Sequence, residues 1–220
     1  MCPRLVAWRE DVATRPGPAV DGSAYWARPV AGFGDPEATV YVLGLATAAH
    51  GGNRTGRAFT GNSSADWLVA SLHRTGFANQ PTSRHRDDGL RLTGAWLASA
   101  VRCAPPGNAP MPAERDACLG HFRDEMGALP QVRVVVCLGA FAWDVALRWA
   151  AVRPKPRFSH RGDHAVAGGP VLLGCYHPSR QNTSTRRLTA AMLDDVLCRA
   201  HELARTAPRP EAEAGRRCCR

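Results

Sequence analysis

Lysine is almost missing from this chain of 220 residues, because Lys155 is the only one. The formal net charge is nevertheless +9, so arginine supplies nearly all of the positive charge. The planar guanidinium group matches the geometry of a phosphate, and a basic domain favours polyanionic partners. The composition therefore favours a polyanion, such as a nucleic acid, as the partner of this protein.

Long apolar runs are missing as well, and none reaches the length that is needed to cross a membrane. The first residues, MCPRLVAWRE, are not followed by the apolar core of a signal peptide. We therefore expect a cytoplasmic protein without a membrane partner. In that compartment the eight cysteines are not expected to form structural disulfides, which favours metal ligation or packing in the core.

Four continuous apolar runs predict buried strands of a parallel sheet, because strands that are covered on both faces lose the alternation of polar and apolar residues. Segments with helical spacing lie between or after them, and no internal repeat is present. The alternation predicts an α/β fold, a three-layer α/β/α sandwich with a central four-stranded parallel sheet. The predicted strands are 38–46, 95–103, 132–139 and 170–177, and the predicted helices are 65–76, 112–129, 140–151 and 186–204.

A glycine-rich loop, GLATAAHGGNRTGRAFTG (44–61), follows the first predicted strand. It lacks the Lys-Ser/Thr pair of a phosphate-binding P-loop, and it is too long and too polar for a dinucleotide-binding turn. Two further polar stretches follow other strands, RCAPPGNAP (102–110) and HPSRQNTSTRRLT (177–189). Because ligands of open parallel sheets bind beyond the carboxyl ends of the strands, we expect these three stretches to surround one site.

Positive charge is most one-sided between residues 151 and 190, where seven basic residues face a single acid, Asp163. Such a stretch is typical of a surface that contacts phosphates, and a solvated arginine-rich face is the alternative. The basic residues are Arg153, Lys155, Arg157, Arg161, Arg180, Arg186 and Arg187.

The three strand-end stretches, together with CPRLVAWRE (2–10) and YWARPVAGFGDP (25–36), resemble the type-5 uracil-DNA glycosylases of the uracil-DNA glycosylase superfamily. These enzymes are similar to the iron–sulfur type-4 enzymes. The resemblance runs from Cys2 to about Ala204, and it implies one such domain over residues 1–205. The composition of residues 206–220 predicts a disordered tail. The resemblance also implies hydrolysis of the N-glycosidic bond of a flipped-out uracil in double-stranded or single-stranded DNA, by a monomer associated with the nucleoid. Deaminated bases such as hypoxanthine are further substrates that the resemblance suggests.

The resemblance assigns roles to the strand-end residues. Phe59 would stack on the base, although a core aromatic that anchors the loop is an equal alternative from the residues alone. Asn108 would hydrogen-bond the base, and its alternative role is that of a turn residue. The catalytic residues would be Asn62, His177 and Asn108, and the base would be held by Ala46, Thr47, Ala48, His50, Gly51 and Phe59. The DNA would be bound by Arg54, Ser179, Arg180, Gln181, Asn182, Arg186 and Arg187.

A [4Fe-4S] cluster is the cofactor that the resemblance implies. Cys103 and Cys118 match the second pair of its ligands, and Cys2 matches the second cysteine of an N-terminal C-x-x-C pair. The first cysteine has no counterpart here, and we expect a start further upstream to supply it. Cys137 and Cys175 fall in predicted strands and are expected to be buried packing residues. Cys198 falls on the last predicted helix, and Cys218 and Cys219 have no assigned role.

Two positions depart from the pattern of the resembled family. Thr47 stands where the family usually has proline, and Asn62 stands where it usually has aspartate. These departures favour, as an alternative, a catalytically weakened homologue that binds damaged DNA. A small redox or regulatory iron–sulfur protein without DNA is a third possibility, and the paired strand-end stretches argue against it.

Overall fold

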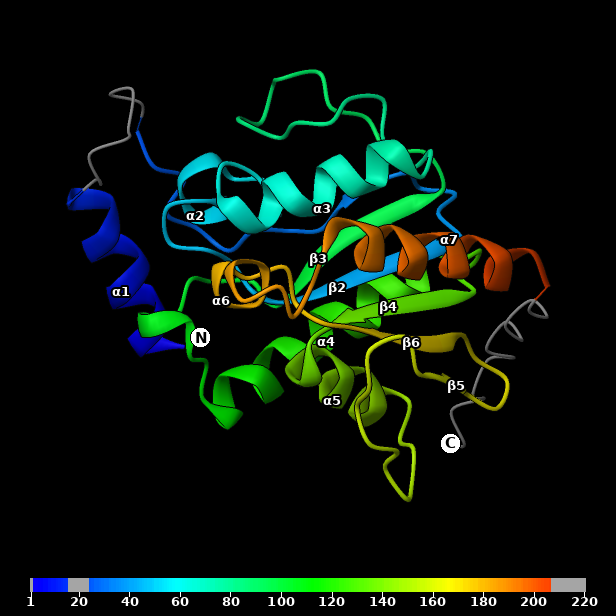
Figure 1. Ribbon diagram of the computed structural model, residues 1–220. Coiled ribbons are helices and arrows are strands. Elements are labelled where there is room, and N and C mark those ends of the chain that lie inside the picture. The colour runs from blue at the N-terminus through cyan, green and yellow to red at the C-terminus, as the bar shows by residue number, and fades with distance from the viewer. Residues whose placement is uncertain (1, 16–23, 207–220) are drawn as a thin grey trace.

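The computed structural model describes residues 2–15 and 24–206, and these form a six-stranded sheet with helices on both faces (Figure 1). The strand order is β1-β3-β2-β4-β6-β5, in which β3, β2, β4 and β6 are parallel. Val42 pairs with both Leu97 and Val136, and Val136 pairs with Leu173, so one row of aliphatic residues crosses the four central strands. The strands are β1 (Phe33–Gly34), β2 (Val40–Ala46), β3 (Ala95–Val101), β4 (Val134–Leu138), β5 (Asp163–Ala165) and β6 (Val171–Cys175).

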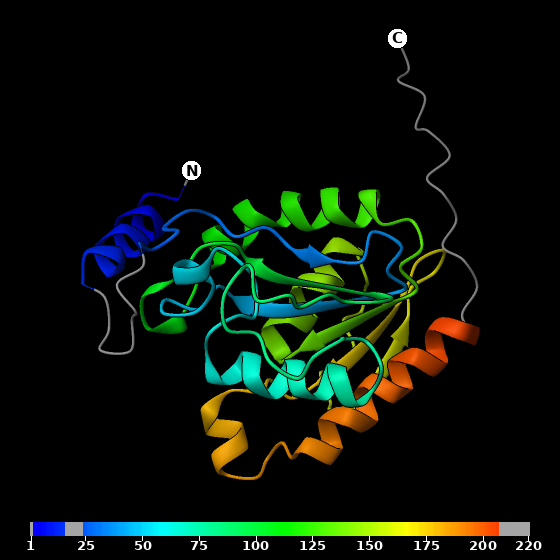
Figure 2. The ribbon, with the colours of Figure 1, turned by 90° about the horizontal axis from the view of Figure 1, so that it is seen from above.

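The helices lie in two layers that enclose the sheet, as the view from above shows (Figure 2). One face is covered by α3 and α7, whose Leu68 and Val196 belong to a core cluster with Val136. The other face is covered by α4 and α5. The helices are α1 (Pro3–Thr14), α2 (Gly52–Thr55), α3 (Ser63–Arg74), the 3-10 turn η1 (Pro106–Asn108), α4 (Pro112–Ala128), α5 (Ala140–Trp149), α6 (Arg180–Ser184) and α7 (Ala190–Thr206).

This arrangement confirms the predicted fold class. The four predicted strands correspond to β2, β3, β4 and β6, and the four predicted helices correspond to α3, α4, α5 and α7. All five residues of β4 are buried, because helices cover both faces of that strand. The antiparallel edge strands β1 and β5 add to the predicted four, and they are too short to leave a pattern in the sequence.

Local signals in the sequence set the ends of the helices that frame the site. The side chain of Asn62 accepts a hydrogen bond from the N–H of Ala65 at 3.0 Å and so caps the start of α3. Gly76, which has a positive φ of 84°, follows the end of that helix. Pro112 occupies the first turn of α4, and Glu114 accepts from the N–H of Met111 at 2.7 Å. The start of α3, which carries Asn62, and the start of α4, which follows Asn108, are thereby fixed.

The predicted single domain over 1–205 remains an expectation, and the predicted tail lies almost wholly in residues 207–220, outside the described part. Among the described residues, none of the helices is long and apolar enough to span a membrane.

Candidate active site

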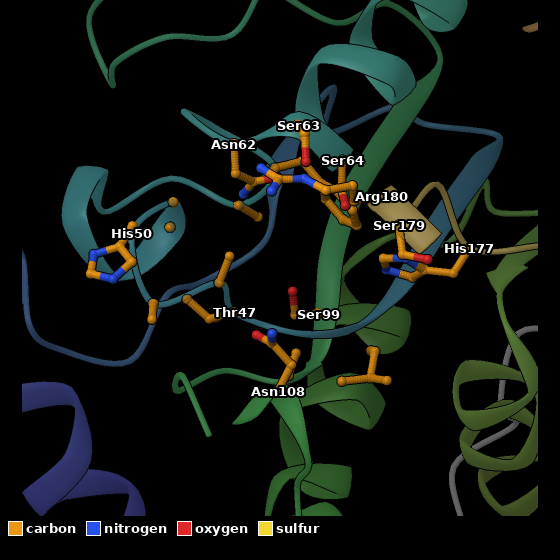
Figure 3. Close-up of a pocket in the computed structure, with 18 residues that line it drawn as sticks. Thr47, His50, Asn62, Ser63, Ser64, Ser99, Asn108, His177, Ser179 and Arg180 are labelled. Carbon is orange, nitrogen blue, oxygen red and sulfur yellow. The ribbon is translucent and has the colours of Figure 1, made fainter. Parts of the chain in front are cut away.

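A cavity of about 570 Å³ lies at the carboxyl ends of the parallel strands (Figure 3). The loop after β2 supplies most of its wall, Ser99 of β3 and Asn108 of η1 supply another part, and the segment from His177 to Arg180 closes it beyond β6. The three polar strand-end stretches therefore do meet at one site, as topology requires of parallel strands.

Phe59 lies on one wall of this cavity in a left-handed backbone conformation, with φ 48°. Its ring rests against the backbone of Gly44, because a Cβ on that glycine would lie only 2.5 Å from Phe59 Cζ. The same ring also packs against the core cluster that contains Val42 and Val136. Both roles considered for Phe59 are thus compatible with its position, since one part of the ring anchors the loop and another lines the cavity.

Thr47 fastens the beginning of the loop to the end of β3. Its N–H donates to the carbonyl of Val101 at 3.0 Å, and its hydroxyl donates to the carbonyl of Arg102 at 2.9 Å. Further along, Gly51 passes close to the side chain of Asn62, and a Cβ there would lie 2.2 Å from Asn62 Nδ2. The glycine is therefore required by the close approach of two segments of the loop.

Asn62 reaches the cavity from the start of α3, beside Ser63 and Ser64. Figure 3 shows Arg180, from the opposite side, extending toward Asn62 and Ser63 across the cavity. Among the described residues that line the cavity there is no carboxylate, and the ionisable groups are His50, His177 and Arg180. The site is therefore neutral to cationic.

His177 follows β6 and its ring points into the cavity (Figure 3). Its carbonyl accepts hydrogen bonds from Asn182 Nδ2 and from the N–H of Ser179, both at 2.8 Å, which fixes the turn that carries the ring. Burial lowers the pKa of His177 to about 4, because the charged form loses hydration there. The imidazole is therefore neutral at physiological pH and can donate one N–H.

Asn108 is exposed, and its carboxamide points into the cavity near Thr47 and Ser99 (Figure 3). It has a positive φ of 56°, and its N–H donates to the carbonyl of Pro105 at 3.2 Å. Asparagine tolerates this left-handed turn conformation better than most residues. The backbone thus has the predicted turn role while the side chain stays available to a ligand.

The residues predicted to bind DNA fall into two groups around the cavity. Ser179 caps α6 by accepting from the N–H of Asn182, while Gln181 and Arg186 are exposed on or just after that helix. Arg187 lies over the ring of Tyr176, with 4.8 Å from its guanidinium carbon to the ring centre. Arg54 is on the other side, on α2, where its Nε donates to the carbonyl of His50 at 3.2 Å.

The basic stretch 151–190 does not form a single surface. Lys155 pairs with Asp144, and Arg161 pairs with Asp195 at 2.6 Å. α5 runs from the carboxyl end of β4 toward the opposite end of the sheet, so Arg153 and Lys155, which follow it, lie away from the cavity. The part of this stretch near the cavity is therefore limited to the residues after β6.

Other residues of the cavity had not been predicted from the sequence. Ser99 offered a signal, because it is a polar residue near the end of an otherwise apolar strand. Ser63 and Ser64 offered only the ordinary signal of a helix start. Leu45, Ala49, Gly52 and Ala58 also line the cavity, and they belong to the loop 44–61 that the sequence predicts, as a whole, to surround the site.

Cys2, Cys103 and Cys118 pack together in a small cluster with Leu5 and Val101. Burial raises the pKa of the Cys118 thiol, and the neighbouring thiols of Cys103 and Cys2 raise it further. No group of three or more His, Cys, Asp or Glu side chains within 2–15 and 24–206 is arranged to hold a metal ion. A [4Fe-4S] cluster makes a different demand, since each thiolate binds its own iron and the sulfurs need not approach one point.

The surroundings of these cysteines suit thiolate ligands. Arg9 Nη1 donates to the sulfur of Cys103 at 3.1 Å, and Arg9 Nε is buried without a hydrogen-bond partner. A partly buried guanidinium against a sulfur favours negative charge on that sulfur. The residues present therefore fit the predicted cofactor as three of its ligands, and no fourth cysteine of the described part joins them.

Cys137 and Cys175 are fully buried in β4 and β6, which confirms their predicted packing role. Burial raises the pKa of Cys175 to about 12, so its thiol stays protonated. Cys198 is exposed on α7, and Cys218 and Cys219 lie outside the described residues.

Comparison with known families identifies the class to which this fold and cavity belong. The model of the uracil DNA glycosylase superfamily matches residues 31–200, which include every wall of the cavity. The chain belongs to the uracil DNA glycosylase superfamily.

Individual relatives narrow that assignment and confirm the resemblance to the type-5 enzymes. The chain is 50% identical over 206 residues to a type-5 uracil-DNA glycosylase of Mycobacterium bovis, which covers 92% of this chain and 77% of that protein. It is 50% identical over 205 residues to the type-5 enzyme of Thermus thermophilus, covering 93% of each. It is 44% identical over 199 residues to that of Pyrobaculum aerophilum, covering 90% of this chain and 86% of the relative.

Proposed function

We propose that this DNA glycosylase hydrolyses the N-glycosidic bond of uracil in double-stranded DNA and leaves an abasic site. The observation that carries the proposal is the convergence, in one cavity, of an aromatic ring, a carboxamide and a neutral imidazole from Phe59, Asn108 and His177. Chemistry on a base requires its extrusion from the stack into such a cavity. We further propose that the enzyme acts as a monomer associated with the nucleoid, where its DNA substrate lies.

The base is recognised by stacking and by hydrogen bonds. Phe59 offers the face of its ring to the base, and its support by Gly44 keeps the ring in place. The amide of Asn108 can donate to one edge of the base and accept from another. Ser99, on the neighbouring wall, adds a hydroxyl that can serve either purpose.

Departure of the base is assisted by His177. As the N-glycosidic bond breaks, negative charge develops on the base and positive charge on the sugar. A neutral imidazole donates its N–H to a carbonyl oxygen of the leaving base, and its low pKa keeps it in that form near pH 7. The hydrogen bond from a fixed donor in a partly dry site becomes stronger as the charge develops. Such a donor contributes about 10²–10³-fold to the rate.

The sugar side of the reaction has no carboxylate among the described lining residues. Asn62 can hold the attacking water by hydrogen bonds, but it cannot accept the proton of that water near neutral pH. The leaving-group side therefore carries most of the rate enhancement. This assignment predicts slow but genuine turnover on uracil.

We also propose that Cys2, Cys103 and Cys118 are ligands of a [4Fe-4S] cluster. When bound, this group joins three segments of the chain, since the thiolates come from the start of α1, the end of β3 and the middle of α4. Arg9 then balances the charge of the sulfur of Cys103. The role of the group is structural, at the side of the site that carries η1 and Asn108.

The departure at Thr47 gives no support to the alternative of a purely DNA-binding homologue. Thr47 uses both its N–H and its hydroxyl to hold the loop against β3, and proline would lack both donors. The loop is therefore held by hydrogen bonds rather than by a rigid ring. The small side chains of Ala46 and Ala48 also leave room for a purine, which supports hypoxanthine as a further substrate.

A single-turnover assay with labelled uracil-containing duplex tests the proposal. His177→Ala should lower the cleavage rate by about 10²-fold or more while duplex affinity stays nearly constant. His73→Ala, which removes an exposed histidine of α3, is the matched control and should cleave at the original rate. Retardation of the duplex without any abasic product from the unaltered protein would favour the binding homologue. Equal rates in His177→Ala and the unaltered protein would refute the role of His177.

A further inference from the structure

We infer that four arginines beside α2 form a second contact surface for the DNA backbone, on the side of the cavity opposite α6. This surface, the arginine rim, consists of Arg28, Arg54, Arg84 and Arg86. The inference rests on the proposed function and extends it, because only Arg54 of this group was expected to bind DNA. The chemistry of the partner is that of consecutive phosphodiester groups flanking the extruded nucleotide.

A buried ion pair holds the loop that carries Arg84 and Arg86 against the body of the domain. Arg57 and Asp88 are joined at 2.8 Å, with side chains only 6% and 8% exposed. Asp88 accepts from the N–H of Arg84 at 2.7 Å and from that of His85 at 3.3 Å, while Arg57 donates to the carbonyl of Arg86 at 2.8 Å. The loop is therefore pinned by its backbone, and the exposed side chains of Arg84 and Arg86 project from a fixed base.

An indole ring supports two of the arginines. The guanidinium carbons of Arg86 and Arg28 lie 4.5 Å and 5.5 Å from the ring centre of Trp26. Gly56 also packs against this ring, since a Cβ there would lie 3.0 Å from the indole. A cation–π contact attracts a guanidinium without pairing it with a carboxylate, so its N–H donors stay available to a phosphate. The ring thus orders the cations without neutralising them.

The rim is continuous with the edge of the cavity. The N–H of Gly61, next to Asn62, donates to the carbonyl of Ser83 at 2.8 Å, and a Cβ on Gly61 would lie 2.4 Å from Arg54 Nη2 and 3.2 Å from the carbonyl oxygen of Arg84. The N–H of Trp26 donates to the carbonyl of Arg54 at 3.0 Å. In Figure 3 the side of the cavity that carries His50 lies across from His177 and Ser179. In Figure 1 the loop between α3 and β3 arches over α3.

The charge of the rim is not compensated locally. None of its four arginines forms an ion pair with a described acidic residue, whereas Arg74, Arg115, Arg148 and Arg161 all do. The exposed acidic residue nearest to Arg84 and Arg86 in the sequence is Asp87, because Asp88 is already paired with Arg57. Uncompensated arginines at the edge of a DNA-binding cavity are what phosphate contacts require, because their affinity comes from displacing cations from the DNA.

The test measures the salt dependence of binding to a duplex that carries a tetrahydrofuran abasic analogue, so that no chemistry interferes. The slope of log K against log salt should fall by about 2 in Arg84→Gln/Arg86→Gln, roughly 0.9 for each lost phosphate contact. Arg123→Gln, which removes an exposed arginine of α4 in the other helical layer, is the control and should keep the original slope. Arg86→Lys should keep the slope but weaken binding several-fold, because lysine has a charge without a planar fork.

Shortened duplexes locate the contact. Removing base pairs on one flank of the analogue should weaken binding of the unaltered protein, and the double variant should lose nothing further on that same flank. An unchanged slope in the double variant, or equal losses on both flanks in both proteins, would overturn the arginine rim. If the unaltered protein neither bound nor cleaved a uracil-containing duplex, the proposed function itself would fail, and the rim with it.

Discussion

At the scale of single residues, Asn62 decides how the sugar side of the cavity works. It combines two tasks, since its oxygen caps α3 and its amide faces the cavity beside Ser63. Aspartate caps a helix as well as asparagine does, and a carboxylate there would be stabilised by the helix start and by the nearby Arg180. The fold therefore tolerates the acid that the pocket lacks.

We predict that Asn62→Asp raises the single-turnover rate on uracil at least about tenfold, a barrier change of roughly 1.4 kcal/mol. The carboxylate would accept a proton from the attacking water and offset positive charge on the sugar, which asparagine cannot do. Duplex affinity should change little. The rate is measured under enzyme excess with a uracil-containing duplex.

Asn62→Ser is the matched control, because serine keeps the helix cap but brings no carboxylate, and it should be no faster than the original chain. An aspartate variant without any gain would mean that a carboxylate on the sugar side adds nothing to the catalysis on the leaving-group side, or that Asn62 suits another base. The same pair of proteins on a hypoxanthine duplex separates these explanations.

At the scale of elements, the sequence predicts those that are long and covered on both faces. β4 shows why, since all five of its residues are buried. A short, continuous apolar run of this length predicts a strand covered on both faces. α1 has no such pattern, because only Leu5 and Val12 are buried along its length. α2 and α6 span four and five residues, too few for any periodicity.

The same distinction holds for the cavity. Phe59, His177 and Asn108 could be predicted because each lies in a polar or glycine-rich stretch after a strand. Ser63 and Ser64 could not, since their presence depends on where α3 begins relative to the cavity rather than on residue type. The buried network around Arg57 could not be predicted either, because it joins Arg57 to Asp88, 31 residues away, in two loops that lie on either side of α3.

The pinned loop between α3 and β3 allows a prediction on stability. Asp88→Ala should lower the free energy of unfolding by about 3–5 kcal/mol, because it leaves the Arg57 guanidinium buried without its charge partner. Leu90 and Arg84 would also lose the acceptor of their N–H groups. Urea unfolding measures the change.

Replacing both partners, Arg57→Met with Asp88→Leu, should cost less than Asp88→Ala alone, since no buried charge remains. A single variant as stable as the original chain would show that the pair does not hold the loop. Asp87→Ala, one residue away and exposed, should stay within about 0.5 kcal/mol of the original and serves as control.

At the scale of the whole molecule, His177 should make stability depend on pH. Its pKa is about 4 in the folded state and ordinarily about 6.5, so the unfolded chain binds the proton first on acidification. The neutral ring makes its full contribution to the free energy of unfolding above about pH 6.5, and this contribution is lost as the pH falls toward 4. We expect this loss of stability to be roughly 2 kcal/mol, which is less than the full pKa difference would give because the ring is partly exposed to the cavity.

Urea unfolding at pH 7 and at pH 4.5 measures this contribution, and His177→Gln should lose less stability between these two values than the original chain. Equal losses would show that His177 does not titrate with a depressed pKa. Asp88 does not obscure the comparison. Burial opposes its ionisation, but the N–H groups of Arg84 and Leu90 and the Arg57 guanidinium outweigh that effect and hold its pKa low, so its contribution is lost at lower pH still.

The distribution of the cavity along the chain has a practical consequence. Its walls come from residues 45–108 and 177–180, whereas the exposed turn around Arg153 lies at the far end of the sheet. A chain divided at that turn would separate Phe59 and Asn108 from His177, and β4 and β6 would still carry complementary edges for pairing. Neither fragment would hold a complete site, so base release would report their reassembly. The two fragments could therefore serve as a split reporter. Its signal would be the strand break that alkali produces at the abasic site left by base release.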